Sequence, residues 1–348
     1  MKTRLTEMLG IAHPIVLPGM TYIAVPRLVA AVCNAGGFAI LASGALSPEE
    51  CRAAIREVRS LTDRPFGVGC SLMLPGAADC ARVALQERVP VINVSMGKGE
   101  WVIEGARAYG GKVIATISNE KHARSAIDSG VDGLIVTGHE AAAHGGKVTS
   151  MVLIPAVRDM TPDLPIIAAG GFADGRGLMA ALALGADAVA MGTRLASSLE
   201  SPMHAATKQL VVDKAAEETI YSSNFDTFPC RVMATPGGRK YTARKLSPPR
   251  VIARSLAAAH ELDTPLTSLA RDAMGQGLVG AVKVAYFGAA TLAMRKAIHE
   301  ADHEHGVQLI GQSQGLVRDV LSVEAIVQRV MSEAQEVALR LQQGLQAS

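Results

Sequence analysis

Aromatic residues are scarce in this sequence of 348 residues, where they make up only 3% of the total. A flat ligand therefore has few rings to stack on, and we expect backbone, methionine and aliphatic groups to hold it. An excess of one charge is also missing, because 34 lysines and arginines balance 32 acidic residues. This balance gives no general attraction to nucleic acid or to a membrane surface. No basic stretch interleaved with aromatic residues suggests single-strand binding.

Signals for export and for membrane insertion are missing too. The segment MKTRLTEMLGIAHPIV has no long apolar run after its lysine and arginine, unlike a secretory leader. No apolar stretch continues for about 18 residues, the length that a membrane span requires. The five cysteines are odd in number, scattered and without CxxC spacing, which favours buried free thiols in a reducing compartment. We therefore predict a cytoplasmic protein without a membrane anchor.

Apolar residues are abundant, at 49% of the sequence, and are enough for a large core. Short runs rich in valine, isoleucine and alanine alternate with longer segments of helical pattern. Each run is apolar on both faces, like a strand buried between a barrel interior and a helix layer. The eight runs cover residues 13–19, 38–43, 65–73, 89–96, 112–118, 132–138, 165–171 and 188–193. We predict an α/β fold, a (β/α)8 TIM barrel. A doubly wound open sheet is the alternative, because periodicity alone does not show closure.

Local signals support these boundaries. In the helical segment 47–61, Ser47 is a good N-cap and Pro48 suits the first helical position. The segments GVDGLI (130–135) and GADAVA (185–190) each place a glycine at a helix end and an aspartate just before a strand.

The alternation stops near residue 210. Residues 215–250 look irregular, and between Arg231 and Arg250 there are six positive charges and no acid. This stretch is either a solvated loop or a lid that faces an anion. We expect an amphipathic helix at 319–346 to pack back onto the barrel, and we expect no metal site in the histidine-rich segment 299–306, which lacks ligand spacing. The predicted units are the barrel over 1–212, a lid or substrate domain over 213–305, and a C-terminal helical segment over 306–348.

Glycine-rich loops follow three of the predicted strands. AAGGFADG (168–175) follows the seventh run and MGTRLASS (191–198) follows the eighth, where barrels often bind phosphate through bare backbone N–H groups. LPGMTY (17–22) places bare backbone and a thioether near the first strand end. Together these loops favour a phosphorylated planar cofactor such as FMN. The alternative is that they are tight turns without a ligand.

The segment GHEAAAHGGK (138–147) contains His139 and His144 after the sixth run. Five positions separate them by roughly 140° on a helix, so they do not share one face as a zinc-binding pair does. Small neighbouring residues would let this loop pass close to a flat ring, where an imidazole can accept or donate a proton. A plain loop histidine is the alternative.

Three longer stretches are similar to one known family: GHEAAAHGGKVTSM (138–151), PIIAAGGFADGRGLMAALALGADAVAMGTR (165–194) and GVQLIGQSQGLVRD (306–319). The chain resembles the FMN-dependent nitronate monooxygenases, once called 2-nitropropane dioxygenases, and the related FMN-dependent enoyl-ACP reductases. The resemblance implies a barrel that holds FMN, with a smaller and mostly helical domain inserted over its mouth.

The resemblance also implies roles for particular residues. His144 matches the catalytic histidine, whereas His139 has no counterpart in role and is expected to be structural. The residues expected to bind FMN are Gly19, Met20, Gly69, Glu140, Ala169, Gly170, Gly171, Met191, Gly192 and Thr193.

Three departures from the family pattern concern the same region. Ala142 and Ala143 replace a glycine pair before the histidine, and their methyl groups would narrow the space above the ring. Gly69 replaces an asparagine whose amide commonly touches flavin. Leu17 and Pro18 replace glutamine and glycine.

The resemblance implies an FMN-dependent oxidoreductase acting on a small molecule. Oxidation of alkyl nitronates with O2 is the leading expectation. The alternatives are reduction of an enoyl thioester, with NADH or NADPH as electron donor and an acyl carrier protein as partner, and reduction of a quinone. A flavin-binding protein without turnover is a further alternative. A homodimer stays open.

Overall fold

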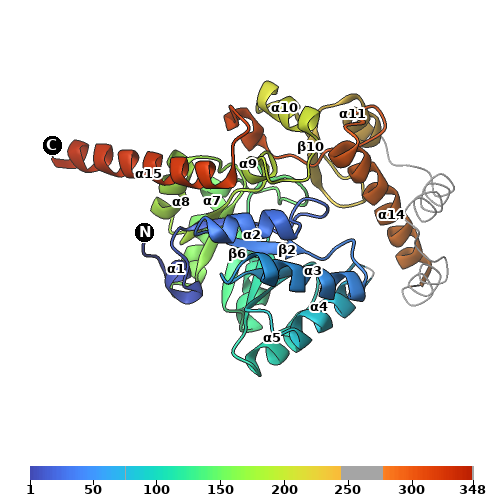
Figure 1. Ribbon diagram of the computed structural model, residues 1–348, viewed down its shortest axis with the longest axis horizontal. Coiled ribbons are helices and arrows are strands. Elements are labelled where there is room, and N and C mark those ends of the chain that lie inside the picture. The colour runs from blue at the N-terminus through green and yellow to red at the C-terminus, as the bar shows by residue number, and fades with distance from the viewer. Residues whose placement is uncertain (75, 244–276, 347–348) are drawn as a thin grey trace.

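The computed structural model describes residues 1–74, 76–243 and 277–346, and its centre is a closed barrel of eight parallel strands (Figure 1). Each strand pairs with its neighbours in chain order, and β1 pairs with β8 through Ile15–Val189 and Val16–Ala190. This last pairing closes the sheet, which confirms the predicted (β/α)8 barrel and excludes the open sheet. The strands are β1 Ile15–Leu17, β2 Phe38–Ala42, β3 Gly67–Ser71, β4 Val91–Ser95, β5 Lys112–Ile117, β6 Gly133–Thr137, β7 Ile166–Ala169 and β8 Ala188–Ala190.

Helices between the strands form the outer layer. The predicted start of α3 is confirmed: Ser47 caps the helix by accepting a hydrogen bond from Glu50 N, and Pro48 is its first residue. The predicted αL glycines Gly130 and Gly185 have φ of 78° and 96°. The helices are α2 Pro26–Asn34, α3 Pro48–Leu61, α4 Ala77–Gln86, α5 Glu100–Arg107, α6 Glu120–Asp128, α7 Ser150–Met160, α8 Gly175–Ala183, α9 Gly192–Ala196 and α10 Ala205–Asp213.

The barrel interior is packed with side chains, and one end of it is closed by a helix. Leu5 and Leu9 of α1 (Arg4–Leu9) belong to the same buried cluster as the inward-facing strand residues. The other members of that cluster include Val16, Phe38, Ile40, Val91, Ile114, Ile135 and Ile167. Because α1 covers the N-terminal ends of the strands, any site on the barrel axis must lie at their C-terminal ends.

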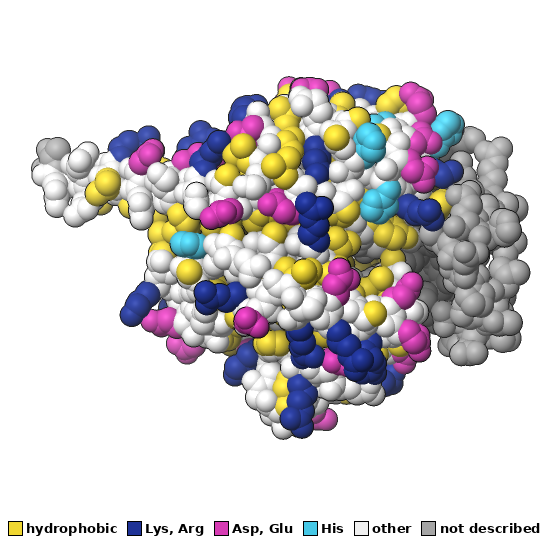
Figure 2. Space-filling view, viewed as in Figure 1, with side chains coloured by type: hydrophobic (Ala, Val, Ile, Leu, Met, Phe, Trp, Pro, Cys, Tyr) yellow, Lys and Arg dark blue, Asp and Glu magenta, His cyan; other side chains and the backbone are white. Residues whose placement is uncertain are grey.

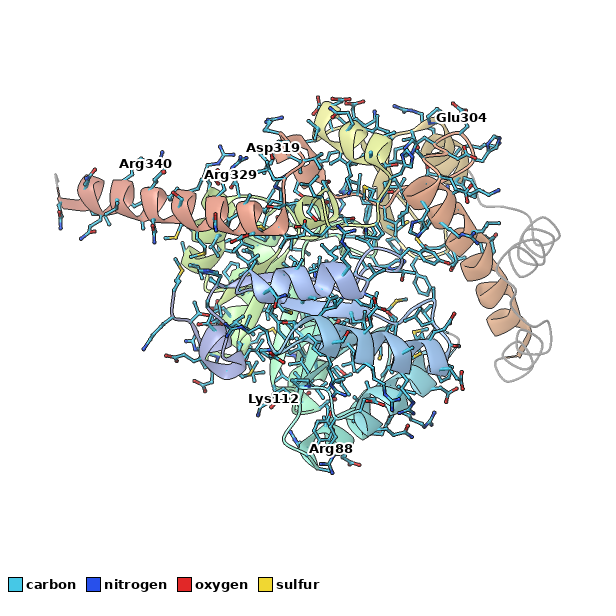
Figure 3. The ribbon with its side chains drawn as sticks, viewed as in Figure 1. Arg88, Lys112, Glu304, Asp319, Arg329 and Arg340 are labelled. Carbon is cyan, nitrogen blue, oxygen red and sulfur yellow. The ribbon has the colours of Figure 1, made fainter. Side chains whose placement is uncertain are left out.

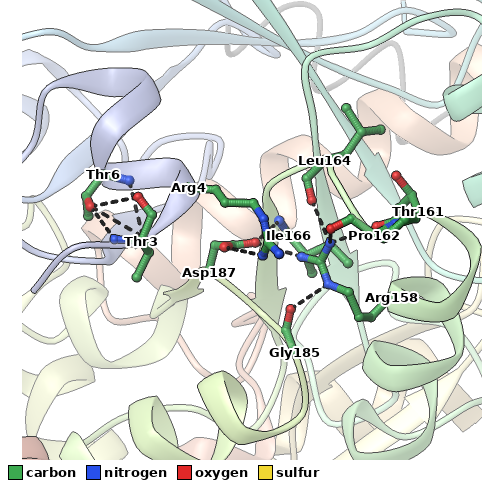
Figure 4. Close-up of polar contacts among 10 residues, drawn as sticks. All are labelled: Thr3, Arg4, Thr6, Arg158, Thr161, Pro162, Leu164, Ile166, Gly185 and Asp187. Carbon is green, nitrogen blue, oxygen red and sulfur yellow. Dashed lines mark hydrogen bonds and ion pairs between the residues drawn. The ribbon is translucent and has the colours of Figure 1, made fainter.

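Asp187, the predicted aspartate just before β8, joins three elements below the barrel (Figure 4). Its carboxylate accepts hydrogen bonds from Arg4 Nη1 at 3.0 Å, Arg158 Nη2 at 2.7 Å and Ile166 N at 3.0 Å. Burial lowers the pKa of the Arg158 guanidinium, and Asp187 opposes that effect. The contacts fix α1 and α7 to the starts of β7 and β8.

A small antiparallel sheet and further helices lie outside the barrel. The sheet consists of β9 Thr219–Ser222 and β10 Cys230–Met233, and α11 Pro236–Ala243 follows. The expectation of an irregular segment is therefore wrong for residues 219–222, 230–233 and 236–243, while the loop 223–229 is irregular. Residues 244–250 of the predicted basic stretch lie outside the described residues. Arg231, the first charge of that stretch, is buried and does not face solvent. The remaining elements are α14 Gly277–His299, the 3-10 helix η1 Gln312–Leu316 and α15 Val323–Gln346.

The C-terminal helix α15 confirms part of the expectation made for it. Val327, Val330 and Ala334 are buried where α15 packs on α8, and the last turns of the helix extend beyond the barrel (Figure 1). Acidic and basic side chains are interspersed over the visible face (Figure 2). No helix among the described residues is both long and apolar enough to cross a bilayer. The domain boundaries at 212 and 305 stay predictions.

Candidate active site

The loops after β1 and β8 approach each other closely at the barrel mouth. A Cβ atom added to Gly192 would lie 3.3 Å from Met20 Sδ, and one added to Gly19 would lie 3.8 Å from Gly69 Cα. The Gly19 position would also meet Ile40 Cγ2 at 3.3 Å. Glycine at these positions thus leaves bare backbone where the resemblance expects a flat ring.

Free backbone N–H groups gather after β7 and β8. These strands are neighbours in register, with Ala169 beside Ala190, so the two loops start side by side. Gly170 and Gly171 have φ of 101° and 88°, a region that glycine adopts without strain. Within the described residues, no acceptor is found for the N–H groups of Gly170, Gly171, Gly192 or Thr193. Four unpaired donors at adjacent strand ends suit an anionic group such as a phosphate.

Glu140 and Thr193 are joined by a segment from near the end of the chain. Gly311 N donates to Thr193 Oγ1 at 3.1 Å, and Gln312 N donates to the Glu140 carbonyl at 2.9 Å. The Glu140 carboxylate accepts from Ser150 N and Ser150 Oγ at 3.0 and 3.1 Å. Thr193 Oγ1 accepts this bond and donates none within the described residues, so its proton can be donated to a ligand.

Met191 and Ala169, both expected at the cofactor, make contacts inside the protein core. The Met191 side chain is fully buried in the core between strands and helices, so only its backbone is near the mouth. The Ala169 carbonyl accepts from Gly138 N and Ser150 Oγ, which uses its acceptor capacity inside the fold. The roles expected of Met191 and Ala169 at the cofactor stay predictions.

His144 pairs with a carboxylate at the edge of the mouth. Its Nε2 lies 2.7 Å from Asp226 Oδ2, and Asp226 is nearly buried, with 8% of its surface exposed. Phe228 meets the imidazole edge to face, with ring centroids 5.7 Å apart. Asp226 and Phe228 belong to the loop between β9 and β10. The arrangement gives an imidazole that is held on one side and 36% exposed on the other.

The β9–β10 sheet holds the loop that carries His144. Arg231 N donates to the Ala143 carbonyl at 3.0 Å, and Tyr221 Oη donates to the Gly145 carbonyl at 2.9 Å. The Arg231 guanidinium donates to the His139 carbonyl. His139 itself packs its ring against Tyr221, with centroids 4.4 Å apart, and its Nδ1 lies 3.0 Å from the Gly146 carbonyl. The structural role expected for His139 agrees with these contacts.

The sequence alone did not indicate Asp226, Tyr221 or Arg231 as part of the site. They come from a segment without clear periodicity, and Asp226 is 82 positions from His144. Gly311 and Gln312 carried a signal, because the stretch GQSQGL was noted for its resemblance to the family.

Comparisons with known proteins agree with this geometry. A family model for nitronate monooxygenases matches residues 2–86 and 76–333. The chain belongs to the nitronate monooxygenase family. It is therefore a flavin-dependent oxidoreductase with a TIM barrel. The unpaired N–H groups of Gly170, Gly171, Gly192 and Thr193 fit the phosphate end of such a cofactor.

Several individual proteins are similar over much of their length. The (3aS,4S,5R,7aS)-5-hydroxy-7a-methyl-1-oxo-octahydro-1H-indene-4-carboxyl-CoA dehydrogenase of Mycobacterium tuberculosis is 33% identical over 342 residues, 96% of each chain. A nitronate monooxygenase of Pseudomonas aeruginosa is 31% identical over 269 residues, covering 63% of this chain and 76% of its own. The structure of FabK from Thermotoga maritima has a TM-score of 0.81 at 35% identity, covering 98% of this chain and 99% of that one.

Proposed function

We propose that this protein is an FMN-dependent oxidoreductase of acyl thioesters. It adds hydrogen to, or removes it from, the α- and β-carbons of the acyl chain. The observation that carries the proposal is the His144–Asp226 pair, at 2.7 Å, with His144 on the same loop as Glu140. Residues 311 and 312 bond this loop at Glu140 and also bond Thr193 after β8. A histidine–aspartate pair can deliver a proton to a carbon next to a carbonyl or remove one from it.

The extent of the similarity favours a thioester over a nitronate. The matches with the M. tuberculosis carboxyl-CoA dehydrogenase and with FabK each extend over more than nine-tenths of this chain. The match with the P. aeruginosa nitronate monooxygenase extends over 63% of it. A relative named for a CoA thioester is thus matched over more of this chain than this nitronate monooxygenase is.

The chain's own residues divide the work as follows. Gly171, Gly192 and Thr193 would bind the FMN phosphate through N–H groups. Gly19 and Gly69 pack tightly on Ile40 and would present bare backbone to its ring. Bound FMN supplies or accepts an electron pair as hydride at the β-carbon of the thioester. In the direction of reduction, the His144 imidazolium gives its proton to the α-carbon as the double bond becomes single. Asp226 stabilises the imidazolium in the meantime.

A second candidate is the oxidation of alkyl nitronates with O2, giving a carbonyl compound and nitrite. The family model and the P. aeruginosa relative support it. The same imidazole would then remove a proton from the carbon next to a nitro group, whose acidity resembles that of a carbon next to a carbonyl.

The two candidates are separated by mixing the FMN-loaded protein with NADH or NADPH in the absence of oxygen. We expect the flavin absorbance to bleach and to return when crotonyl-CoA is added. Crotonyl attached to an acyl carrier protein, tested in parallel, shows which carrier gives the higher kcat/KM. A flavin that crotonyl thioesters leave reduced, together with nitrite release from propyl-2-nitronate in air, would overturn the thioester proposal in favour of the second candidate.

A further inference from the structure

Two strained residues flank the His144–Asp226 pair, one on each side. Ala143, directly before His144, has φ of 53°, and Thr227, directly after Asp226, has φ of 79°. This left-handed region is rare for residues other than glycine, and for a β-branched residue such as threonine it is a true outlier. Strain of this kind persists where the surrounding structure enforces it, and it gathers at functional sites.

The strain is held in place by specific contacts. Asp226 Oδ1 accepts from Phe228 N at 3.1 Å, which closes a short turn over Thr227. Arg231 N holds the Ala143 carbonyl at 3.0 Å. Both partners of the pair are therefore fixed by backbone bonds that do not involve the imidazole.

The contacts also distinguish the two nitrogens of His144. Nε2 lies 2.7 Å from Asp226 Oδ2, so a proton on this nitrogen is donated to the carboxylate. Nδ1 has no partner within the described residues, and the side chain is 36% exposed.

We infer that Asp226 is a positioning residue which keeps the proton of neutral His144 on Nε2, so that Nδ1 exchanges the substrate's proton. The inference rests on the proton-transfer role proposed for His144. In reduction, Nδ1–H gives its proton to the α-carbon and is reloaded from solvent. In oxidation, the lone pair of Nδ1 takes the proton from the α-carbon while the hydride of the β-carbon would go to the flavin, so the thioester is oxidised, the flavin would be reduced and His144 changes only its protonation.

The substitution Asp226→Asn tests this assignment because the asparagine side chain has nearly the same size as that of aspartate. Its amide oxygen must stay on Phe228 N, so the amide NH2 group takes the place of Oδ2 and points at His144 Nε2. Nε2 must then accept a hydrogen bond, which forces the proton of the neutral ring onto Nδ1. We expect kcat for crotonyl-thioester reduction to fall by about 10²–10⁴-fold, the range for a lost proton transfer, with KM changed by less than about 3-fold.

Nitrogen NMR of the FMN-loaded protein, labelled with ¹⁵N-histidine, reads the ring directly. We expect a protonated Nε2 in the parent protein and a protonated Nδ1 in Asp226→Asn. Asp302→Asn is the matched control, since Asp302 also pairs with a histidine, His305, at 3.1 Å on the surface. This control should leave kcat and the His144 resonances unchanged.

Two results would overturn the inference: a parent protein with its proton on Nδ1, or an Asp226→Asn protein with unchanged kcat. If no thioester is turned over by any variant, the proposed function fails, but the NMR comparison still decides how Asp226 orients the ring. A normal flavin spectrum and circular dichroism confirm that each variant is folded.

Discussion

Arg231 donates two hydrogen bonds to a single acceptor, the carbonyl oxygen of His139, from Nε at 3.2 Å and from Nη2 at 2.9 Å. Its third nitrogen donates to Thr219 Oγ1, and the guanidinium lies 5.4 Å from the centre of the Tyr221 ring. Burial lowers the pKa of this guanidinium, although the group stays charged at any ordinary pH. The charge that looked from the sequence like part of an anion-facing lid thus holds the active-site loop.

Arg231→Lys should therefore destabilise the protein although the charge is kept. A lysine has no planar fork and cannot replace both bonds to His139. We expect the free energy of unfolding to fall by about 1–3 kcal/mol in urea titrations, because a buried carbonyl loses its donors. Arg239→Lys is the control, as Arg239 is exposed and should change stability by less than about 0.5 kcal/mol. Equal losses in the two variants would contradict the role given to Arg231.

Ala143→Gly should stabilise the fold, because φ of 53° destabilises an alanine by about 1–2 kcal/mol, whereas glycine adopts it without strain. Part of this gain is offset by the greater freedom of glycine in the unfolded chain. We expect a net rise of roughly 0.5–1 kcal/mol in the free energy of unfolding. Ala142→Gly, one position earlier and without a positive φ, should lower it by a similar amount. A loss of stability in both variants would show that the left-handed backbone at 143 carries no strain.

Thr193→Val should weaken the binding of FMN. The valine keeps the shape but removes the acceptor of Gly311 N and the hydroxyl group beside the proposed phosphate site. We expect the Kd for FMN to rise by about 10-fold, roughly 1.4 kcal/mol, in fluorescence titrations of the apoprotein. Thr193→Ser retains the hydroxyl and should bind FMN nearly as well as the parent. Unchanged binding by the valine variant would remove Thr193 from the phosphate site.

The carboxylate of Asp319 should make stability depend on pH in acid. It accepts from Arg194 at 2.7 Å and from Arg329 at 2.6 Å, and Figure 3 shows Asp319 and Arg329 on neighbouring segments. Burial alone would raise the pKa of this carboxyl, but the two arginines outweigh burial and hold it below its ordinary 3.8. A lowered pKa in the folded state means that the stabilisation is complete above pH 3.8 and is lost as the pH falls further.

The substitution Asp319→Asn isolates this contribution. We expect the variant to be about 1–2 kcal/mol less stable than the parent at neutral pH, after allowance for screening by solvent. The difference should shrink steadily as urea titrations are repeated below pH 3.8. Asp79→Asn is the control, because the Asp79–Arg82 pair is exposed on both sides and should contribute little at any pH. A difference for Asp319→Asn that does not vary with pH would exclude its charge as the cause.

The features that could be predicted from the sequence are those set by neighbours in the chain. Ser47 and Pro48 start a helix through contacts within one turn, and the glycines at 170 and 171 give a backbone that few other residues adopt. The strand runs, with their period and their length, were enough to predict the barrel. Closure itself depends on the pairing of β1 with β8, far apart in sequence, and periodicity does not report such a contact.

Several residues of the candidate site could not be predicted from local sequence patterns. Asp226 and Tyr221 act through contacts with a loop some 80 residues earlier, and strands of four residues are too short to show a period. Met191 illustrates a related limit: its position beside Gly192 places it near the expected ligand, while its side chain is buried in the core. Direction of a side chain depends on tertiary packing, which a single sequence does not encode locally.

The helix α1, seated against the packed barrel interior through Leu5 and Leu9, has a kinetic consequence. With the interior filled and its N-terminal end covered by α1, the flavin of the proposed function would be reached only from the C-terminal ends of the strands. We expect the electron donor and the thioester to occupy that one face of the flavin in turn. Steady-state rates measured at several fixed donor concentrations should then give parallel lines in double-reciprocal plots, the signature of ping-pong turnover.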